Sequence, residues 1–377
     1  MKHTCRPVGT KENENVIPAS FSVIPTCSES FLLVRNRKER FWTSQNDKRT
    51  SPDRSEASHG TSQHDKEVDF QVKKVLLTGA GGFIGRHSIP FLLKNDYEVH
   101  AVYNIAETDI AAHKNLFWHK CDLLNSAEQK YLLSKIKPTH LLHFAWYTAH
   151  GKYWTAIENL RWVQASLDLF VNFAENGGRR AVGAGTCAEY DWNYGYCSEE
   201  ITPLKPSTLY GACKHSLQEI LSHYSKQIGI SFAWGRIFFL YGHYEYPRRL
   251  VPYVICSLLK NQTAQCSHGN QVRDFLHVED VASAFIALLE SDVQGAVNIA
   301  SGKPLALKEV IYKIAQKIGG VDRIQLGVIP SPADEPQTLT ADARRLTEEV
   351  GWQPEYDIDR GLEHTIEWWR SYLNITT

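Results

Sequence analysis

The residues with the clearest capacity for chemistry are a tyrosine and a lysine four positions apart, Tyr210 and Lys214. Positions i and i+4 share one face of a helix, so both side chains would project side by side from a helix that follows Pro206-Ser207-Thr208. A phenol has a pKa of about 10, and a neighbouring ammonium lowers it by stabilising the phenolate. Such a tyrosine can exchange protons at neutral pH. Taken alone, the spacing is also that of an ordinary helix-surface pair.

A hydroxyl group is expected beside this pair. Thr186 stands at the end of a predicted strand, Ala181–Thr186, which precedes the helix that carries Tyr210 and Lys214. Its hydroxyl would bind and polarise the same substrate oxygen that the tyrosine protonates or deprotonates. We therefore predict one catalytic group made of Thr186, Tyr210 and Lys214.

A glycine-rich loop, Thr78–Gly85 (TGAGGFIG), follows a predicted strand and begins a predicted helix. Gly79 allows a tight turn, Gly82 lets the backbone approach a pyrophosphate, and Gly85 permits close packing of helix on strand. Free N–H groups and the helix dipole then attract a diphosphate. The spacing is G-x-x-G-x-x-G rather than G-x-G-x-x-G, and a purely structural turn is the alternative. We expect a dinucleotide, NAD or NADP.

The choice between NAD and NADP depends on the end of the second predicted strand, where a carboxylate favours NAD and an arginine favours NADP. That strand ends Val102-Tyr103-Asn104 and offers neither, while Glu107 lies slightly late and Arg86 follows the glycine loop. Both cofactors therefore stay open. Asp122, followed by Leu123, is placed after the third predicted strand to accept a hydrogen bond from adenine. A helix N-cap is its alternative role.

These residues need a scaffold of alternating strands and helices. Apolar runs predict strands over Lys73–Thr78, Glu98–Tyr103, Leu116–His119, His140–Ala145, Ala181–Thr186 and Ser231–Phe239. Helical periodicity predicts helices over Gly82–Lys94, Trp154–Glu175 and Leu209–Gln227. The alternation predicts an α/β fold whose parallel sheet is covered on both faces. After Tyr241 the pattern becomes irregular, as expected for a smaller lobe interleaved with the last strands.

The texture of the chain changes near residue 72. Residues 1–72 are rich in Ser, Thr, Asn and charges of both signs, and their low apolar content predicts a disordered extension. Lys11–Asn15 stands where a secretory signal would need an apolar run. We therefore divide the chain into an extension (1–72), a cofactor-binding domain (73–240) and a mainly substrate-binding lobe (241–377).

Composition excludes several classes of protein. Lys and Arg (41) nearly balance Asp and Glu (42), so no global field attracts nucleic acid or an anionic membrane. No run approaches the roughly 18 consecutive apolar residues of a membrane span. The eight cysteines are dispersed without a C-x-x-C pair, and no Cys/His group has metal-ligand spacing. We expect reduced thiols, a cytoplasmic protein and no metal site.

An ordered set of motifs runs from Lys73 to Trp369. Its members are TGAGGFIG (78–85), Asp122-Leu123, His143-Phe144-Ala145, Asn159, Thr186 with Tyr190, Tyr210 with Lys214, Arg236 with Tyr241-Gly242, RDFLHVEDV (273–281), Asn298–Gly302 and Val350–Pro354. With this set the chain resembles an extended short-chain dehydrogenase/reductase of the nucleotide-sugar epimerase/dehydratase type. The resemblance implies a Rossmann-type doubly wound parallel sheet with a smaller C-terminal lobe. It also implies a homodimer that pairs the helices near 154–175 and 207–228.

The resemblance implies individual roles as well. Tyr210 would be the acid/base, and Lys214 would also bond the nicotinamide ribose. The other cofactor-binding residues would be Gly79, Gly82, Phe83 and Ile84 along the pyrophosphate, Asp122 and Leu123 beside adenine, Ala145 behind the nicotinamide, and Asn159.

Two arginines are expected to bind the substrate. Arg273 would grip its diphosphate, a task suited to a guanidinium, with a salt bridge to Asp274 or Glu279 as the alternative. Arg249, together with Arg248, could supply further positive charge.

Departures from the family pattern narrow the reaction. Sugar 4,6-dehydratases of this family place Asp-Glu directly after the catalytic threonine, where this chain has Cys187 and Ala188, so we expect no dehydratase activity. Phe239 replaces an asparagine that usually contacts substrate, and Pro332–Glu335 stands where a late R-x-G-[DE] segment is expected. The identity of the nucleotide is thereby left open.

Aromatic residues concentrate in the loops around the expected substrate cleft. Rings that stack on a sugar or base and rings that form a plain hydrophobic lid would look alike. The residues are Trp146, Tyr147, Tyr153, Trp154, Tyr190, Trp192, Tyr194 and Tyr196.

The sequence therefore predicts an NAD(P)-dependent enzyme that acts on a nucleotide-linked 6-deoxysugar. The expected reaction is reduction of a 4-keto group or its reverse, with Tyr210 moving the proton. The first alternative is a 4-epimerase with tightly held NAD, and the second is a non-catalytic NAD(P)-binding protein. Fold alone does not decide among these.

Overall fold

The computed structural model describes residues 72–104, 110–331 and 335–375. The predicted extension over residues 1–72 lies outside this part of the chain, apart from Val72. In the described part, no helix combines the length and the apolar character that crossing a membrane requires.

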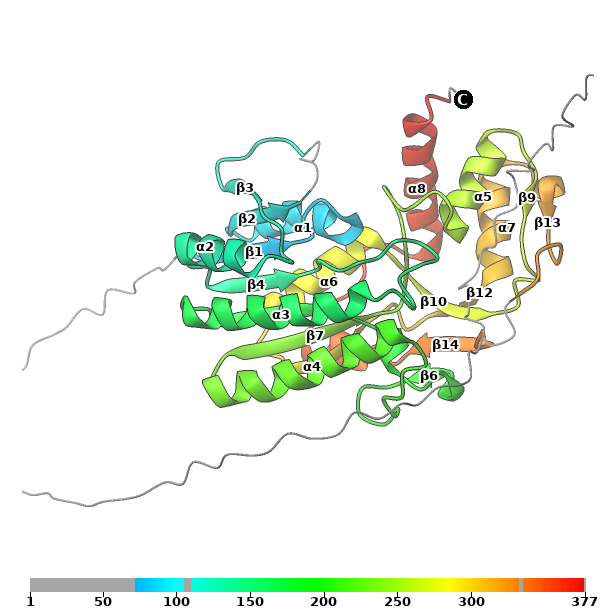
Figure 1. Ribbon diagram of the computed structural model, residues 1–377. Helices are drawn as coiled ribbons and strands as arrows, with labels where there is room; N and C mark the ends of the chain where they lie inside the picture. Colours follow the sequence, from blue (N-terminus) through cyan, green and yellow to red (C-terminus); the bar gives the residue numbers. More distant parts are fainter. Residues whose placement is uncertain (1–71, 105–109, 332–334, 376–377) are drawn as a thin grey trace, which may run out of the picture. The chain divides into compact units, whose positions relative to one another are not determined.

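A seven-stranded parallel sheet is the largest sheet of the described chain (Figure 1). Its order is β11-β7-β5-β4-β1-β2-β3, so the chain starts in the middle, runs to one edge and then returns to build the other. The strands are β1 (Lys74–Thr78), β2 (Glu98–Tyr103), β3 (Leu116–Lys120), β4 (His140–His143), β5 (Arg180–Thr186), β7 (Ser231–Ile237) and β11 (Gly295–Ile299). This order confirms the predicted doubly wound α/β fold.

Alternating side chains of β1 explain why both faces of the sheet are covered. Val75 and Leu77 pack into a core with α1 (Phe83–Lys94) and α6 (Val278–Glu290). Leu76 points to the opposite face, into a core that α3 (Glu158–Glu175) and α4 (Leu209–Ile228) also enter. The near-continuous apolar strands seen in the sequence follow from this burial on two sides.

Before Tyr241, one α-helix of the described chain was not predicted; after Tyr241 the sequence analysis predicts no individual helices. α2 (Ser126–Ile136) follows β3, and Asn125 caps it by accepting hydrogen bonds from the backbone N–H groups of Ala127 and Glu128. Its apolar face is short, with Leu133 and Ile136 as its buried aliphatic residues, which weakens the periodic signal. The predicted helix over Trp154–Glu175 also begins later than expected, at Glu158.

The predicted strand Ser231–Phe239 divides into two strands that belong to different sheets. β7 ends at Ile237 in the main sheet, whereas β8 (Phe239–Tyr241) pairs with β10 (Val272–His277). The second sheet has five strands: β12 (Pro304–Ala306), β10, β14 (Thr338–Ala341) and β6 (Tyr196–Cys197) lie in the order β12-β10-β14-β6, and β8 pairs with β10 beside them. The chain therefore changes sheets at Phe238.

Three helices build a further core beside the second sheet (Figure 1). They are α5 (Leu250–Leu259), α7 (Leu307–Ile318) and α8 (Ile358–Tyr372), and the short strands β9 (Ala264–Gln265) and β13 (Ile324–Gln325) pair beside them. Because β11 and α6 come after residue 241 but pack with the main sheet, the chain passes between the two regions more than once.

Candidate active site

The turn between β1 and α1 has the geometry of a pyrophosphate cradle. Gly79 has φ +67°, and a Cβ atom there would lie 2.9 Å from the backbone nitrogen of Ala145. A Cβ at Gly85 would overlap the Gly79 carbonyl, which explains the third glycine. Gly82 is exposed and caps α1 without any side-chain hydrogen bond. Backbone N–H groups at a helix N-terminus are donors for a diphosphate, so the turn fits the cofactor expected there.

Asp122, at the predicted adenine position, does not cap a helix. Asp122 Oδ1 accepts the N–H of Leu124 at 3.0 Å, and the cap of α2 is Asn125, so the alternative role of Asp122 as N-cap is not the observed one. Leu123 is buried beside it. Arg86 lies with its guanidinium carbon 3.3 Å from the centre of the Tyr244 ring. Glu107 lies outside the described residues.

Thr186 and Tyr210 meet at the carboxyl end of the main sheet. Thr186 is the last residue of β5, and its hydroxyl accepts the N–H of Ala188 at 3.2 Å. Tyr210 lies in the first turn of α4, which Thr208 caps by accepting the N–H of Gly211. A side-chain hydrogen bond joins Tyr210 to Thr186. The structure thus brings together two of the three predicted catalytic residues in direct contact.

Burial raises the pKa of Tyr210, with a further contribution from Tyr153, and the bond from Thr186 opposes it. The phenol is therefore protonated at neutral pH. Lys214 lies one turn further along α4, where its Nζ donates to the Ala184 carbonyl at 2.9 Å. The expected lowering of the Tyr210 pKa by Lys214 is not observed, because burial dominates and the lysine bonds a different atom.

Lys214 is itself strongly perturbed. It is 3% exposed, and Nζ lies 3.8 Å from the centre of the Trp146 ring. Burial lowers its pKa to about 7, although Glu189 acts in the opposite direction. A lysine poised at this pKa changes charge within the physiological range, which ordinary lysines do not.

Asn159 and Ala145 make hydrogen bonds that position the backbone around the site. Asn159 is fully buried: its Oδ1 accepts from the indole N–H of Trp146 at 2.8 Å, and its Nδ2 donates to the carbonyls of Tyr153 and Ala156. It therefore holds the loop that covers Tyr210. The N–H of Ala145 donates to Thr78 Oγ1 at 3.3 Å, beside the glycine turn.

The aromatic residues of the loops divide into two groups. Tyr153 and Trp154 are buried and pack edge-on against Tyr210, with ring centres 5.0 and 5.7 Å away. In contrast, Tyr194 and Tyr196 are exposed. The first group forms a hydrophobic lid over the tyrosine, as one of the two predicted alternatives requires.

The two predicted substrate arginines differ in their contacts. Arg273 is 1% exposed and pairs with Glu335 at 2.9 Å, so its partner is neither Asp274 nor Glu279. Its guanidinium carbon lies 5.3 Å from the centre of the Phe239 ring.

Arg249, the second predicted substrate arginine, contacts the hydrophobic lid at Tyr153. Arg249 precedes α5 and hydrogen-bonds the phenol of Tyr153, the ring that packs on Tyr210. Burial still raises the pKa of Tyr153 to about 12.

Sequence reasoning missed Glu189, which is fully buried behind Thr186. Its Oε1 accepts the N–H of Thr186 at 2.8 Å and the indole N–H of Trp234 at 2.9 Å, and its Oε2 accepts from Arg236 Nε at 2.7 Å. The carboxylate thereby fixes the end of β5. A Thr followed three residues later by Glu is the sequence signature of a capping box, which was the available signal.

The two positions after Thr186 cannot supply an acid and a base. Cys187 is buried, and burial raises the pKa of its thiol, so it stays protonated. Ala188 has no titratable group.

Comparisons with known proteins agree with this geometry. The NAD dependent epimerase/dehydratase family matches residues 75–300. UDP-glucuronic acid decarboxylase 1 of Xenopus tropicalis is 25% identical over 311 residues, which cover 80% of this chain and 73% of that protein. CDP-abequose synthase of Salmonella typhimurium strain LT2 is 24% identical over 316 residues, which cover 80% of this chain and 99% of that protein.

Solved structures give the same result. UDP-N-acetylglucosamine 4-epimerase from Methanobrevibacter ruminantium M1, in complex with UDP-N-acetylmuramic acid, superimposes with a TM-score of 0.72 at 25% identity, covering 80% of this chain and 99% of that one. The UDP-glucose 4-epimerase of Thermus thermophilus, in complex with NAD, reaches 0.69 at 24% identity, covering 79% and 99%. NAD, one of the two expected cofactors, is named by the family description and by that complex. Because the match spans more than half of the chain and the motifs lie where the fold requires them, the chain belongs to the NAD dependent epimerase/dehydratase family.

Proposed function

We propose that this protein transfers a hydride between its dinucleotide and C4 of a nucleotide-linked sugar, with Tyr210 moving the proton of the C4 oxygen. The observation that carries the proposal is the hydrogen-bonded pair of Thr186 and Tyr210, with Lys214 one turn further along the same helix. These groups suit the interconversion of a carbonyl group and a hydroxyl group at one carbon.

The protonation states favour the reductive direction at neutral pH. A protonated Tyr210 can donate its proton to the oxygen of a 4-keto group as that oxygen gains charge, while Thr186 orients and polarises the same oxygen. NAD, when bound, would supply the hydride donor or acceptor. Gly79, Gly82, Phe83 and Ile84 would hold its pyrophosphate, Asp122 and Leu123 its adenine, and Ala145 and Lys214 its nicotinamide end.

Two arginines would hold the substrate diphosphate. Arg249 contacts the lid at Tyr153, and Arg273 is already paired with Glu335. Binding through Arg273 would therefore exchange part of its pairing with Glu335 for the diphosphate. The two positions after Thr186 hold no acid/base pair, and this does not support water elimination.

A 4-epimerase is the second candidate, because a 4-epimerase is among the structures that superimpose well on this chain. It would use Thr186, Tyr210 and Lys214 for oxidation followed by reduction at the same carbon. The two functions differ in one measurable property. An epimerase turns over without added NAD(H), whereas a reductase consumes one NADH for each sugar reduced.

The test uses Tyr210→Phe, which removes the hydroxyl and keeps the ring against Tyr153. We expect turnover of nucleotide sugars to fall by about 10²-fold or more, the scale of a lost general acid, while NAD binding changes little. The assay follows NADH absorbance and sugar composition with 4-keto-6-deoxy and 4-hydroxy sugars linked to UDP, dTDP, CDP or GDP.

Tyr224→Phe is the matched control, since Tyr224 lies on the same helix and packs on Phe170 away from the site. It should retain activity. Wild-type turnover in the Tyr210→Phe protein would refute the mechanism. Turnover without added NADH, together with NAD released from the denatured protein, would select the epimerase.

A further inference from the structure

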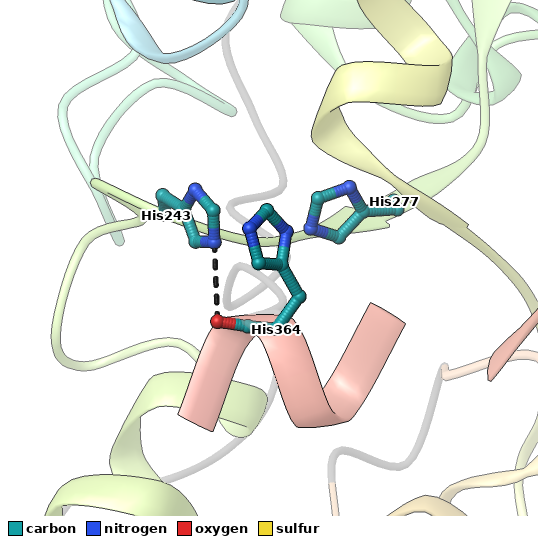
Figure 2. Close-up of side chains that lie close together, drawn as sticks. All are labelled: His243, His277 and His364. Atoms are coloured by element: carbon teal, nitrogen blue, oxygen red, sulfur yellow. Dashed lines mark hydrogen bonds between the residues drawn. The ribbon is translucent and has the colours of Figure 1, made fainter. Parts of the chain in front are cut away.

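Three histidines from separate parts of the chain converge in the C-terminal region (Figure 2). His243 follows β8, His277 ends β10, and His364 lies on α8. One ring nitrogen from each lies within 4.8 Å of the others. The rings of His243 and His364 are 4.3 Å apart between centres, and those of His277 and His364 are 5.7 Å apart. We call these three residues the histidine cluster.

The cluster is buried and incompletely bonded. His243 and His277 are 6% and 1% exposed, and His364 is half-buried. Neither ring nitrogen of His277 has a hydrogen-bond partner among the described residues, nor does His364 Nδ1. A buried polar atom without a partner costs about 1–3 kcal/mol, so three such atoms at one place need a reason.

The other contacts of the histidine cluster position its side chains but leave these three ring nitrogens without hydrogen-bond partners in the described part of the chain. His243 Nε2 lies 3.3 Å from the backbone carbonyl of His364, the dashed line in Figure 2. A carboxylate also lies near the cluster: Glu279 Oε1 is 3.8 Å from His243 Nδ1, and its Oε2 accepts from the Tyr356 hydroxyl at 3.0 Å. His87 packs on the outer side of His243, with its Nε2 3.2 Å from the His243 carbonyl.

We propose that the histidine cluster is a binding site for a divalent transition-metal ion of the zinc type. Imidazole nitrogen is a preferred ligand of Zn²⁺, Co²⁺, Ni²⁺ and Cu²⁺, whereas Mg²⁺ and Ca²⁺ require oxygen ligands. Three imidazoles leave a fourth position for water or for the nearby Glu279 carboxylate. The ion would supply the partner that His277 and His364 lack.

The dimensions and protonation of the cluster suit this assignment. Zn–N bonds of about 2.1 Å place tetrahedral ligand nitrogens about 3.4 Å apart, so closure needs side-chain shifts on the order of 1 Å. Burial lowers the pKa of His243 to about 4 and of His277 to about 2. Both imidazoles are therefore neutral at pH 7, which is the form that binds a metal ion.

The placement of the cluster assigns the ion a mechanical role. β8 and β10 are paired strands of the second sheet, and His277 lies opposite Tyr241 in that pairing. α8 is the last helix of the described chain. An ion held by all three residues would tie α8 to the sheet, and its binding free energy would add to the stability of this region.

The test measures metal binding to the tag-free full chain after treatment with a chelator. Co²⁺ is added as a spectroscopic probe, and Zn²⁺ and Mg²⁺ are compared by calorimetry and thermal unfolding. We expect one equivalent of Co²⁺ to give visible absorption typical of nitrogen ligands and Zn²⁺ to displace it. Zn²⁺ should raise the unfolding temperature, and Mg²⁺ should not.

His364→Gln is the first variant, because His364 is half-buried and its loss leaves the sheet intact. We expect its Zn²⁺ affinity to fall at least tenfold. His223→Gln, at an exposed histidine of α4, is the matched control and should bind like the wild type. His243→Gln provides a second variant should the first unfold. Equal Co²⁺ spectra in wild type and both cluster variants, or no stoichiometric binding, would overturn the proposal.

Discussion

Burying the Lys214 ammonium costs folding free energy, although we propose that this residue acts in catalysis. Its ammonium is buried between the Ala184 carbonyl and the Trp146 ring, and burial lowers its pKa from 10.5 to about 7. Because the unfolded chain binds this proton more tightly, the wild-type protein gains stability as pH rises from about 7 to 10. Below pH 7 the folded protein must carry the buried charge.

Replacing this lysine should therefore stabilise the protein while removing activity. We expect Lys214→Met to raise the free energy of unfolding at pH 6 by about 1–2 kcal/mol, since an apolar chain of similar length avoids the buried charge. At pH 9 the advantage should be smaller, because the wild-type lysine is then neutral in the folded protein, and it should vanish only above about pH 10.5, where the unfolded lysine is neutral as well. Urea unfolding of both proteins at the two pH values measures this. A difference that does not depend on pH would contradict the lowered pKa.

Glu189 fixes the end of β5 behind Thr186, and its removal should appear first as lost stability. Glu189→Gln keeps an oxygen for the Thr186 N–H but leaves Arg236 without its buried counter-charge. Stranding a buried charge costs about 3–5 kcal/mol, and we expect a loss of unfolding free energy of that size. Adding Arg236→Met should restore much of it, because the pair is then absent. A double variant as unstable as the single one would show that the charge pair is not the cause.

At the scale of elements, the turn between β1 and α1 leads to a steric prediction. Alanine at an interior helix position normally stabilises by about 1 kcal/mol relative to glycine. Gly85 is the exception, since its Cβ would overlap the Gly79 carbonyl. We expect Gly85→Ala to cost about 1–3 kcal/mol and to weaken NAD binding about tenfold or more.

Gly229→Ala separates this effect from a general loss of glycine. Gly229 caps α4 with φ +74° and has open space around a Cβ atom, so the change should cost about 1 kcal/mol and leave NAD affinity unchanged. Titration of both variants with NAD, followed by intrinsic fluorescence, makes the comparison. Normal NAD affinity in Gly85→Ala would exclude this turn as the pyrophosphate site.

Elements with a strong local signal were predictable from the sequence. β1, β2 and α4 end within a residue of their predicted limits, because buried strands and capped helices leave clear patterns. α2 was missed, since few of its residues face the core. The break at Phe238 was also missed, because Phe239 pairs with a strand more than thirty residues away, and no local pattern encodes that pairing.

The residues of the candidate site also fall into those that the sequence predicts and those that it does not. Tyr210 with Lys214, Thr186 and the glycine turn could be found because their spacing follows from one helix, one strand end and one turn. The pairing of Arg273 with Glu335 and the histidine cluster could not, since each joins segments distant in the sequence. The burial that raises the Tyr210 pKa comes from loops whose path the sequence does not specify.

At the scale of the whole molecule, Asn298 links the two sheets. It is fully buried in β11, its Oδ1 accepts from the Tyr190 hydroxyl, and its Nδ2 donates to the carbonyls of Cys197 and Asp342. These carbonyls belong to β6 and to the residue after β14, so one amide joins the main sheet to the second. The proposed substrate arginines and the proposed catalytic group are thereby held in one framework.

The last prediction is a homodimer that forms through the outer surface of α3 and α4. These helices pack side by side on the main sheet, yet Leu160, Val171 and Ile220 stay exposed on them. Leu160 and Val171 are eleven residues apart, so they lie on one face of α3. Burial of such a stripe against a second copy would remove apolar surface from water.

We expect the protein to sediment as a dimer at micromolar concentration. Val171→Lys should shift it to a monomer, because pairing about a two-fold axis buries the same residue of both copies near one interface and repeats the charge there. Tyr312→Lys, at an exposed residue of α7, is the control and should leave the sedimentation coefficient unchanged. If the wild type sediments as a monomer across this range, or if Val171→Lys remains dimeric, these helices do not form the interface.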